Sequence, residues 1–153
     1  KEGEELLKEY YERHKDDEVK PLDLEKSFNI KIAGAKFFGR IDRIDPLDGG
    51  VEIIDYKTGN TMTQKQVDKD DQVAFYAIAA KDALDLKPKR LTYYFLDSGE
   101  RVSTTRTDEQ LEKIKEETKK IIEEMKEGNF DASPGMHCNW CDYNEICPFS
   151  YKG

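Results

Sequence analysis

Two acidic residues and a lysine, Asp42, Asp55 and Lys57, stand on either side of the strongest turn signal in the sequence. The segments that contain these three residues are rich in β-branched side chains, which predicts two strands joined by the turn. Like charges across an antiparallel pair repel each other, and burial strengthens the repulsion. A divalent cation removes that conflict, because Mg²⁺ is held by one or two carboxylates together with substrate phosphate. A lysine beside such a site can activate water or neutralise charge on a phosphate.

The turn decides whether these side chains meet. A two-residue loop at Asp48-Gly49 places Asp42 opposite Asp55, whereas a loop at Gly49-Gly50 places Asp42 opposite Lys57. Both registers put the three side chains on one face of the sheet, because Asp55 and Lys57 are two residues apart. A three-residue loop without a bulge separates them. The alternative interpretation is a solvent-facing hairpin end that carries no site.

The elements that must position these residues follow from hydrophobic periodicity and turn signals. Helices are predicted over residues 2–15, 64–85 and from Thr107 to a C-terminal Gly128, and strands over 24–33, 35–45, 51–59, 90–97 and 101–107. Thr63 with Gln66 and Thr107 with Gln110 are candidate capping boxes. The order α-β-β-β-α-β-β-α, followed by a cysteine-bearing tail, predicts an α/β or α+β domain on one mixed sheet.

The length and the net charge of the chain limit the classes of function that it can have. A chain of 153 residues suffices for a single domain over residues 1–153 with its own core. Its formal net charge of −8 argues against a protein that coats nucleic acid through bulk electrostatics, although an enzyme that binds DNA through a local basic patch and bridging metal ions is compatible with it. The sequence has neither a membrane-spanning apolar run nor a signal-peptide apolar region at its start, so we expect a cytoplasmic protein with no membrane partner.

Three short motifs carry a family resemblance. GRID as G-x-x-D, DYK as D-x-K and QVAFY as Q-x-x-x-Y resemble the ordered motifs of the PD-(D/E)xK nucleases of the RecB type. That group includes the nuclease domains of RecB and AddB helicase-nucleases and their CRISPR-associated relatives. The resemblance covers residues from about 24 to the end and implies a restriction-endonuclease-like αβββαβ core. It also implies an Mg²⁺- or Mn²⁺-dependent deoxyribonuclease of the exonuclease type, acting in DNA repair or recombination beside a helicase domain or subunit.

The resemblance also assigns roles to the hairpin residues. Asp42 and Asp55 would be the metal-binding carboxylates, Lys57 the catalytic lysine, and the main-chain carbonyl of Tyr56 a further metal ligand. The expected chemistry is attack of an activated water on a phosphodiester.

Gln72 and Tyr76 form the Q-x-x-x-Y motif and, four residues apart, share one face of a helix. By resemblance they contact DNA or brace the site. The alternative is an ordinary helix on which Tyr76 is a core residue and Gln72 a surface residue.

Histidine departs from the family pattern. Family members carry a metal-binding His on a helix upstream of the first core strand, and the only candidates here are His14 and His137. The setting of His14, YYERHKDD, does not match the expected motif. We therefore expect the motif to lie before residue 1, in a longer parent protein, and the isolated fragment to be weakly active.

Three cysteines lie close together near the C-terminus. Cys138, Cys141 and Cys147 form C-x2-C-x5-C, a spacing that suits zinc or an iron–sulfur cluster. The arrangement resembles the iron–sulfur staple of AddB-like nucleases, which implies a 4Fe-4S cluster whose fourth ligand lies outside this chain. A Zn²⁺ site completed by His137 is the rival, and three free thiols are the third possibility.

Two further functions compete with the nuclease. A catalytically silent DNA-binding or scaffolding module of the same fold is compatible with the missing histidine. A redox or metal-sensing protein built on the cysteines leaves the D-x-K and Q-x-x-x-Y motifs unexplained.

Overall fold

The computed structural model describes residues 2–128 and 130–151. The elements are α1 (Glu2–His14), β1 (Asp23–Ile32), β2 (Ala35–Leu47), β3 (Gly50–Lys57), α2 (Gln64–Val67), α3 (Asp71–Asp82), β4 (Pro88–Phe95), β5 (Arg101–Thr104), α4 (Asp108–Lys126) and the 3₁₀ helix η1 (Met136–Trp140). The contacts divide the chain into two compact units, residues 1–119 and 120–153. None of the helices within the described ranges is long and apolar enough to cross a membrane.

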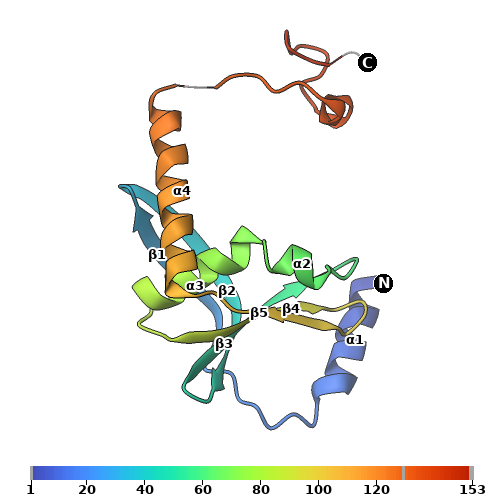
Figure 1. The fold of residues 1–153 in the computed structure, drawn as a ribbon. Coiled ribbons are helices and arrows are strands. Elements are labelled where there is room, and N and C mark those ends of the chain that lie inside the picture. The colour runs from blue at the N-terminus through green and yellow to red at the C-terminus, as the bar shows by residue number, and fades with distance from the viewer. Residues whose placement is uncertain (1, 129, 152–153) are drawn as a thin grey trace. The chain divides into compact units, whose positions relative to one another are not determined.

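A five-stranded sheet with the order β1-β2-β3-β4-β5 forms the centre of the first unit (Figure 1). β3 and β4 are parallel, and the other neighbouring pairs are antiparallel. A parallel pair needs a crossover connection, and here α2 and α3 supply it. The predicted mixed α+β fold of the restriction-endonuclease-like type is therefore confirmed.

The hairpin between β2 and β3 closes with one of the two predicted two-residue loops. Leu47 pairs with Gly50, so the loop is Asp48-Gly49, and Gly49 has a φ of 74°. This left-handed conformation is the reason for glycine at that position. From there the register runs without a slip to Arg43 opposite Ile54. The prediction of a two-residue loop at Asp48-Gly49 is confirmed, and the alternative loops are wrong.

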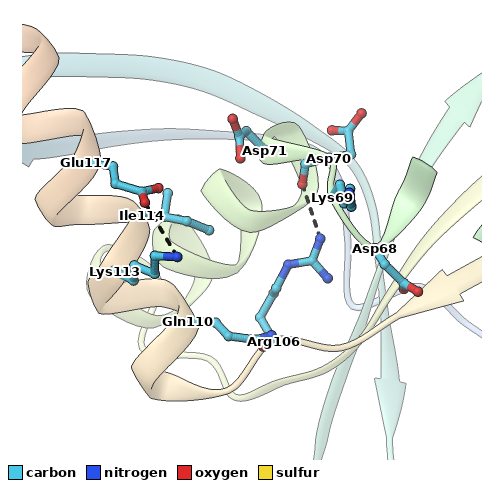
Figure 2. A pocket seen from close by; sticks show the side chains of 9 residues that line it. All are labelled: Asp68, Lys69, Asp70, Asp71, Arg106, Gln110, Lys113, Ile114 and Glu117. Atoms are coloured by element: carbon cyan, nitrogen blue, oxygen red, sulfur yellow. Dashed lines mark hydrogen bonds and ion pairs between the residues drawn. The ribbon is translucent and has the colours of Figure 1, made fainter. Parts of the chain in front are cut away.

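The helix predicted over residues 64–85 is wrong as one element, because it is divided into α2 and α3. Asp70 caps α3, accepting the main-chain N–H of Gln72 at 2.8 Å. The Arg106 guanidinium donates to the carbonyl of Asp70 at 3.2 Å (Figure 2). It also donates to the carbonyl of Val67 at 3.1 Å, so Arg106 supplies hydrogen bonds to the backbone at the break between the helices. A pocket of about 230 Å³ lies beside this break, and its lining includes neither Asp55 nor Lys57.

Each face of the sheet has its own helix. Residues paired across β3 and β4 point the same way, and their neighbours along each strand point the other way. α3 covers the face that carries Asp55 and its partner Tyr93, through a hydrogen bond from Tyr76 to Asp55. α1 lies on the opposite face, where the Tyr10 ring packs edge-on against Tyr56 at a centroid distance of 5.5 Å.

The second unit contains the end of α4 and the cysteine-bearing tail. Predicted as irregular, the tail forms η1 and a series of turns, including one from the Tyr143 carbonyl to the Cys147 N–H at 2.9 Å. Several of its large apolar side chains are exposed: Met136, Trp140, Tyr143, Ile146 and Phe149.

Candidate active site

The hydrogen-bonded ladders of the sheet are interrupted at Asp42. The cross-strand pairs of β1 and β2 skip this residue together with Glu25, whose φ of 51° is left-handed. The β2–β3 ladder ends one residue away, at Arg43 and Ile54. The Asp42 Oδ2 instead accepts the main-chain N–H of Tyr56 at 2.9 Å. This hydrogen bond holds the Asp42 carboxylate against the end of β3.

Asp55 occupies the position that the turn predicted, one step beyond the last pair of the β2–β3 ladder. Its side chain is buried, with 4 % of the residue exposed. The Oδ1 accepts hydrogen bonds from the Tyr76 hydroxyl at 3.0 Å and the Gln72 Nε2 at 3.1 Å. The Oδ2 lies 2.7 Å from the Lys57 Nζ, but no donor is aligned to make a hydrogen bond with it. One oxygen of this buried carboxylate therefore has an ion-pair neighbour without a hydrogen bond.

The surroundings of Asp55 shift its pKa upward. Burial raises the pKa of Asp55 above its ordinary value, and the ammonium of Lys57 and the hydroxyl of Tyr76 offset only part of that. The negative charge of Asp42 raises the same pKa further, so the two carboxylates are close enough to repel. A bound cation would reverse this balance by favouring the charged form.

Lys57 has two further contacts besides Asp55. Its Nζ donates to the Gln72 Oε1 at 2.8 Å and lies 4.8 Å from the centroid of the Tyr93 ring. An ammonium at this distance is attracted to the ring face. Tyr93 is fully buried, and its hydroxyl donates to the Asp70 Oδ1 at 2.8 Å, so one aromatic residue connects the lysine to the cap of α3.

Tyr93 is the site residue that sequence reasoning missed. It stands opposite Asp55 in the parallel ladder, and burial with the Asp70 carboxylate beside it raises the pKa of its hydroxyl. Its motif, LTYYF, reads only as a strand. The parallel pairing of β3 with β4 is the signal that could have found it, and no local pattern specifies that pairing.

Gln72 and Tyr76 have the burial expected of an ordinary helix and also the contacts expected of residues that brace the site. Tyr76 is a buried residue and Gln72 is mostly exposed, as expected for an ordinary helix. Both nevertheless donate hydrogen bonds to the same oxygen of Asp55, and the Gln72 Nε2 also donates to the Tyr76 hydroxyl at 2.8 Å. The geometry brings this pair to the acidic residue, and contact with DNA stays a prediction.

His14 lies on the other side of the sheet. Its Nε2 is 2.9 Å from the hydroxyl of Tyr94, which neighbours Tyr93 on β4 and therefore points to the opposite face. Its Nδ1 is 2.6 Å from the Asp17 Oδ2. Both ring nitrogens have partners away from Asp55, so His14 is not positioned to share a metal with it.

The cysteines do not form a closed metal site in the structure. All three thiols are free of disulfides. The main-chain N–H of Gly135 lies 3.5 Å from the Cys138 Sγ, and main-chain N–H groups of Tyr151 and Gly135 lower the pKa of this thiol. Within residues 2–128 and 130–151, no three His, Cys, Asp or Glu side chains gather as a metal-binding group.

A hard divalent cation fits the hairpin end on its donor chemistry. Two carboxylates, Asp42 and Asp55, lie side by side, and the Oδ2 of Asp55 is buried without a hydrogen bond. Mg²⁺ and Mn²⁺ accept such oxygen ligands, and Mg²⁺ commonly completes its shell with water and substrate phosphate. Two carboxylates are consistent with that mode, although the described residues offer no third acidic ligand. The carbonyl of Tyr56 stays a predicted ligand.

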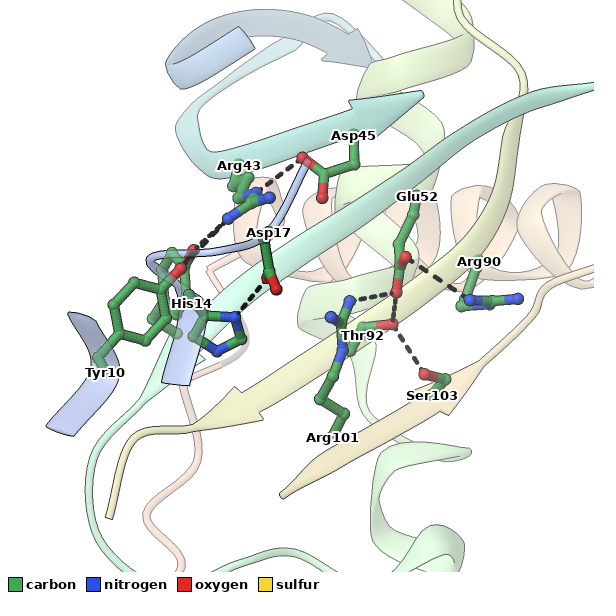
Figure 3. Close-up of polar contacts among 11 residues, drawn as sticks. Tyr10, His14, Asp17, Arg43, Asp45, Glu52, Arg90, Thr92, Arg101 and Ser103 are labelled. Atoms are coloured by element: carbon green, nitrogen blue, oxygen red, sulfur yellow. Dashed lines mark hydrogen bonds and ion pairs between the residues drawn. The ribbon is translucent and has the colours of Figure 1, made fainter. Parts of the chain in front are cut away.

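The opposite face carries a second polar network, which the sequence did not suggest (Figure 3). The Glu52 Oε1 accepts hydrogen bonds from the Thr92 hydroxyl at 2.6 Å and the Arg101 Nη2 at 2.9 Å. Arg43 donates to Asp45 at 2.7 Å, and that contact raises the pKa of the guanidinium. Both buried carboxylates on this face have arginine partners.

Three comparisons relate the chain to known proteins. A family model described as the PD-(D/E)XK nuclease superfamily matches residues 2–148. The Gene 69 proteins of Mycobacterium phages L5 and D29 are each 30% identical over 132 residues, which covers 82% of this chain. The matched segment spans 44% of the L5 protein and 47% of the D29 protein, less than half of each. A solved structure described as the crystal structure of SSO0001 aligns with a TM-score of 0.49 at 17% identity, covering 95% of this chain and 68% of that one.

Proposed function

The chain belongs to the PD-(D/E)XK nuclease superfamily, and from this premise we propose that it is a metal-dependent deoxyribonuclease domain. The observation that carries the proposal is the environment of Asp55. A buried carboxylate with an oxygen that lacks a hydrogen bond, a second carboxylate beside it and a lysine at 2.7 Å is costly in a purely structural role. Perturbed groups of this kind concentrate at catalytic sites.

Each residue of the site has a role in phosphodiester hydrolysis under this proposal. Asp42 and Asp55 would hold Mg²⁺ or Mn²⁺, and the ion would supply Lewis-acid chemistry, lowering the pKa of water and neutralising phosphate charge. Lys57 presents its ammonium to the phosphate oxygens as their negative charge grows. Gln72 and Tyr76 fix the orientation of Asp55 through their two hydrogen bonds.

The proposal extends to the type of nuclease. We assign the domain to the RecB and AddB type, acting as an exonuclease in DNA repair or recombination, within a larger cytoplasmic helicase-nuclease. The ordered motifs at Asp42, Asp55 and Gln72 support this, together with the cysteine-bearing tail. The phage proteins extend well beyond the matched segment, which is consistent with a larger parent.

The cysteine tail has a structural role in this proposal. Cys138, Cys141 and Cys147 would ligate a 4Fe-4S cluster, or Zn²⁺, together with a fourth ligand, and so tie down the second unit. The main-chain N–H of Gly135 directed at the Cys138 sulfur supports a thiolate at that position. Iron and zinc analysis of the anaerobically purified protein, with ultraviolet–visible spectra, tests this part independently of nuclease activity.

Cleavage of labelled DNA tests the central proposal. Purified protein should degrade DNA in Mg²⁺ or Mn²⁺ and not in EDTA, and Asp55→Asn and Lys57→Ala should each abolish the activity. Glu52→Gln is the matched control, since it changes a buried carboxylate on the same strand and the opposite face. Full activity in both site variants would refute the assignment. DNA binding without cleavage by the wild-type protein would instead identify the silent DNA-binding module.

A further inference from the structure

One face of the β1–β2 hairpin is solvent-exposed along both strands. Its residues form three cross-strand pairs: Ser27 with Arg40, Asn29 with Phe38, and Lys31 with Lys36. All six residues are exposed, and Phe38 shows 72 % of its surface. We call this surface, Ser27, Asn29, Lys31, Lys36, Phe38 and Arg40, the ribbon face. An aromatic ring displayed between cations is the property that needs an explanation.

The inner face of the same hairpin is packed against α3. The Phe37 ring stacks on Phe75 at a centroid distance of 5.6 Å, and the Phe28 ring meets Tyr76 edge-on at 6.1 Å. A Cβ at Gly39 would lie 2.3 Å from the Phe28 ring, so glycine at that position lets the ring cross the strand. The hairpin is therefore anchored from one side, and Phe38 is presented on a supported surface.

Charge on the ribbon face is positive although the whole chain carries −8. Arg40 is paired with Glu25 at 2.7 Å. Lys31 and Lys36 have no ion pair within the described ranges of the chain. Asp82 lines a hollow beside Lys31, but it is already 2.7 Å from Lys115. Two lysines are thus available for an anionic partner.

The ribbon face and the candidate site share strand β2. Arg40 precedes Asp42 by two residues on β2, and Phe38 precedes it by four. At about 3.3 Å of rise per residue, Phe38 and Asp42 are separated by about 13 Å of strand. Phe28 and Asp55 both contact Tyr76 of α3, so the ribbon face, which points away from Phe28, lies on the other side of the sheet from Asp55.

We propose that the ribbon face binds single-stranded DNA, with a base stacked on Phe38 and phosphates contacted by Lys31 and Lys36. Exposed aromatics between cations are the elements that single-strand binding proteins use, because every unpaired base offers a ring face. A duplex keeps its bases stacked internally and offers no such face to Phe38. Binding does not require the proposed nuclease function; only the passage of a bound strand around the sheet to Asp42 and Asp55 rests on it.

Fluorescence anisotropy in EDTA measures binding while excluding metal-dependent cleavage. With a labelled single-stranded oligonucleotide, Phe38→Ala should weaken affinity about tenfold, and Phe38→Trp should retain it. Tyr11→Ala, which removes an exposed aromatic on α1, should leave affinity unchanged. Lys36→Ala should reduce the slope of log affinity against log salt by about 0.7, while Lys20→Ala, an exposed lysine outside the hairpin, should not.

The outcomes separate this inference from the proposed nuclease. No binding of single strands, or equal losses for Phe38→Ala and Tyr11→Ala, overturns the ribbon proposal even if the protein cleaves DNA. A larger effect of Phe38→Ala on duplex than on single-stranded DNA also overturns it. Binding that depends on Phe38, in a protein that cleaves no DNA with Mg²⁺ or Mn²⁺, supports the ribbon face and rejects the nuclease. Circular dichroism and thermal melting confirm that each variant is folded.

Discussion

Two buried carboxylates on β3, Glu52 and Asp55, have opposite surroundings on opposite faces of the sheet. Glu52 is 7 % exposed, with hydrogen bonds from Thr92 and Arg101 and an ion pair to Arg90 at 3.6 Å. Asp55 is 4 % exposed, and its Oδ2 has no hydrogen bond. Both side chains are buried to a similar degree. Only Glu52 has enough positively charged partners to compensate the loss of its contacts with water.

The difference distinguishes a structural carboxylate from a candidate catalytic one. Burial of a charge is tolerated when hydrogen bonds and opposite charges replace water, which is the situation of Glu52. Burial raises the pKa of Asp55 and the Asp42 carboxylate raises it further, while its one lysine offsets only part of that rise. A site that must accept a cation keeps part of its coordination open, so the incomplete environment is the one that can do chemistry.

The largest expected effect is on catalysis, and it should follow only one of the two carboxylates. Asp55→Asn should lower the rate of DNA cleavage by at least about a hundredfold, because it removes a charge that the transition state needs. Glu52→Gln should keep the wild-type rate at temperatures where it is folded. Single-turnover rates on labelled DNA measure both, and equal losses would remove the distinction between the two faces.

Stability should show the reverse order. Glu52→Gln should lower the free energy of unfolding by about 2 kcal/mol, because it weakens hydrogen bonds to charged partners in a buried setting. Asp55→Asn should leave stability unchanged or raise it, since it removes a buried charge that is incompletely paired. Urea unfolding of the metal-free proteins gives both values. A greater loss for Asp55→Asn than for Glu52→Gln would mean that Asp55 is the structural residue.

Local chemistry explains why part of the site was predictable. The Asp48-Gly49 turn fixes its own register, and that register leads to the juxtaposition of Asp42 and Asp55. The Thr107 and Gln110 capping box likewise begins α4 as predicted, with Gln110 accepting the Thr107 N–H at 2.8 Å. Both predictions rested on sequence patterns only a few residues long.

Contacts between distant segments explain what was missed. The break between α2 and α3 is completed by Arg106, which lies 36 residues beyond Asp70 in sequence. Tyr93 meets Lys57 only because β4 runs parallel to β3. The partners of Glu52 come from β4 and β5. Hydrophobic periodicity predicts none of these pairings, because each depends on where another element packs.

A smaller effect should separate the two functions of Tyr93. Tyr93→Phe keeps the ring beside Lys57 but removes the hydroxyl that bonds Asp70, so the cleavage rate should fall only about fivefold, the equivalent of one hydrogen bond. Tyr93→Leu removes the ring as well, so Lys57 loses its aromatic neighbour and the cleavage rate should fall further than in Tyr93→Phe. Identical losses in the two variants would show that the ring does not act through Lys57.

The smallest effect concerns pH, and its sign follows from the raised pKa of Asp55. The folded protein binds the Asp55 proton more tightly than the unfolded chain, so this residue adds stability as pH falls toward its ordinary carboxyl pKa of about 3.9. Other carboxylates, such as Asp108 with its lowered pKa, act in the opposite direction. The difference in unfolding free energy between wild type and Asp55→Asn isolates the contribution, and it should change in favour of wild type between about pH 7 and about pH 4. Because Mn²⁺ favours the charged carboxylate, saturating metal at neutral pH should stabilise wild type and not the variant. A difference that stays constant with pH and metal would place Asp55 with Glu52, as a carboxylate whose neighbours already compensate its charge.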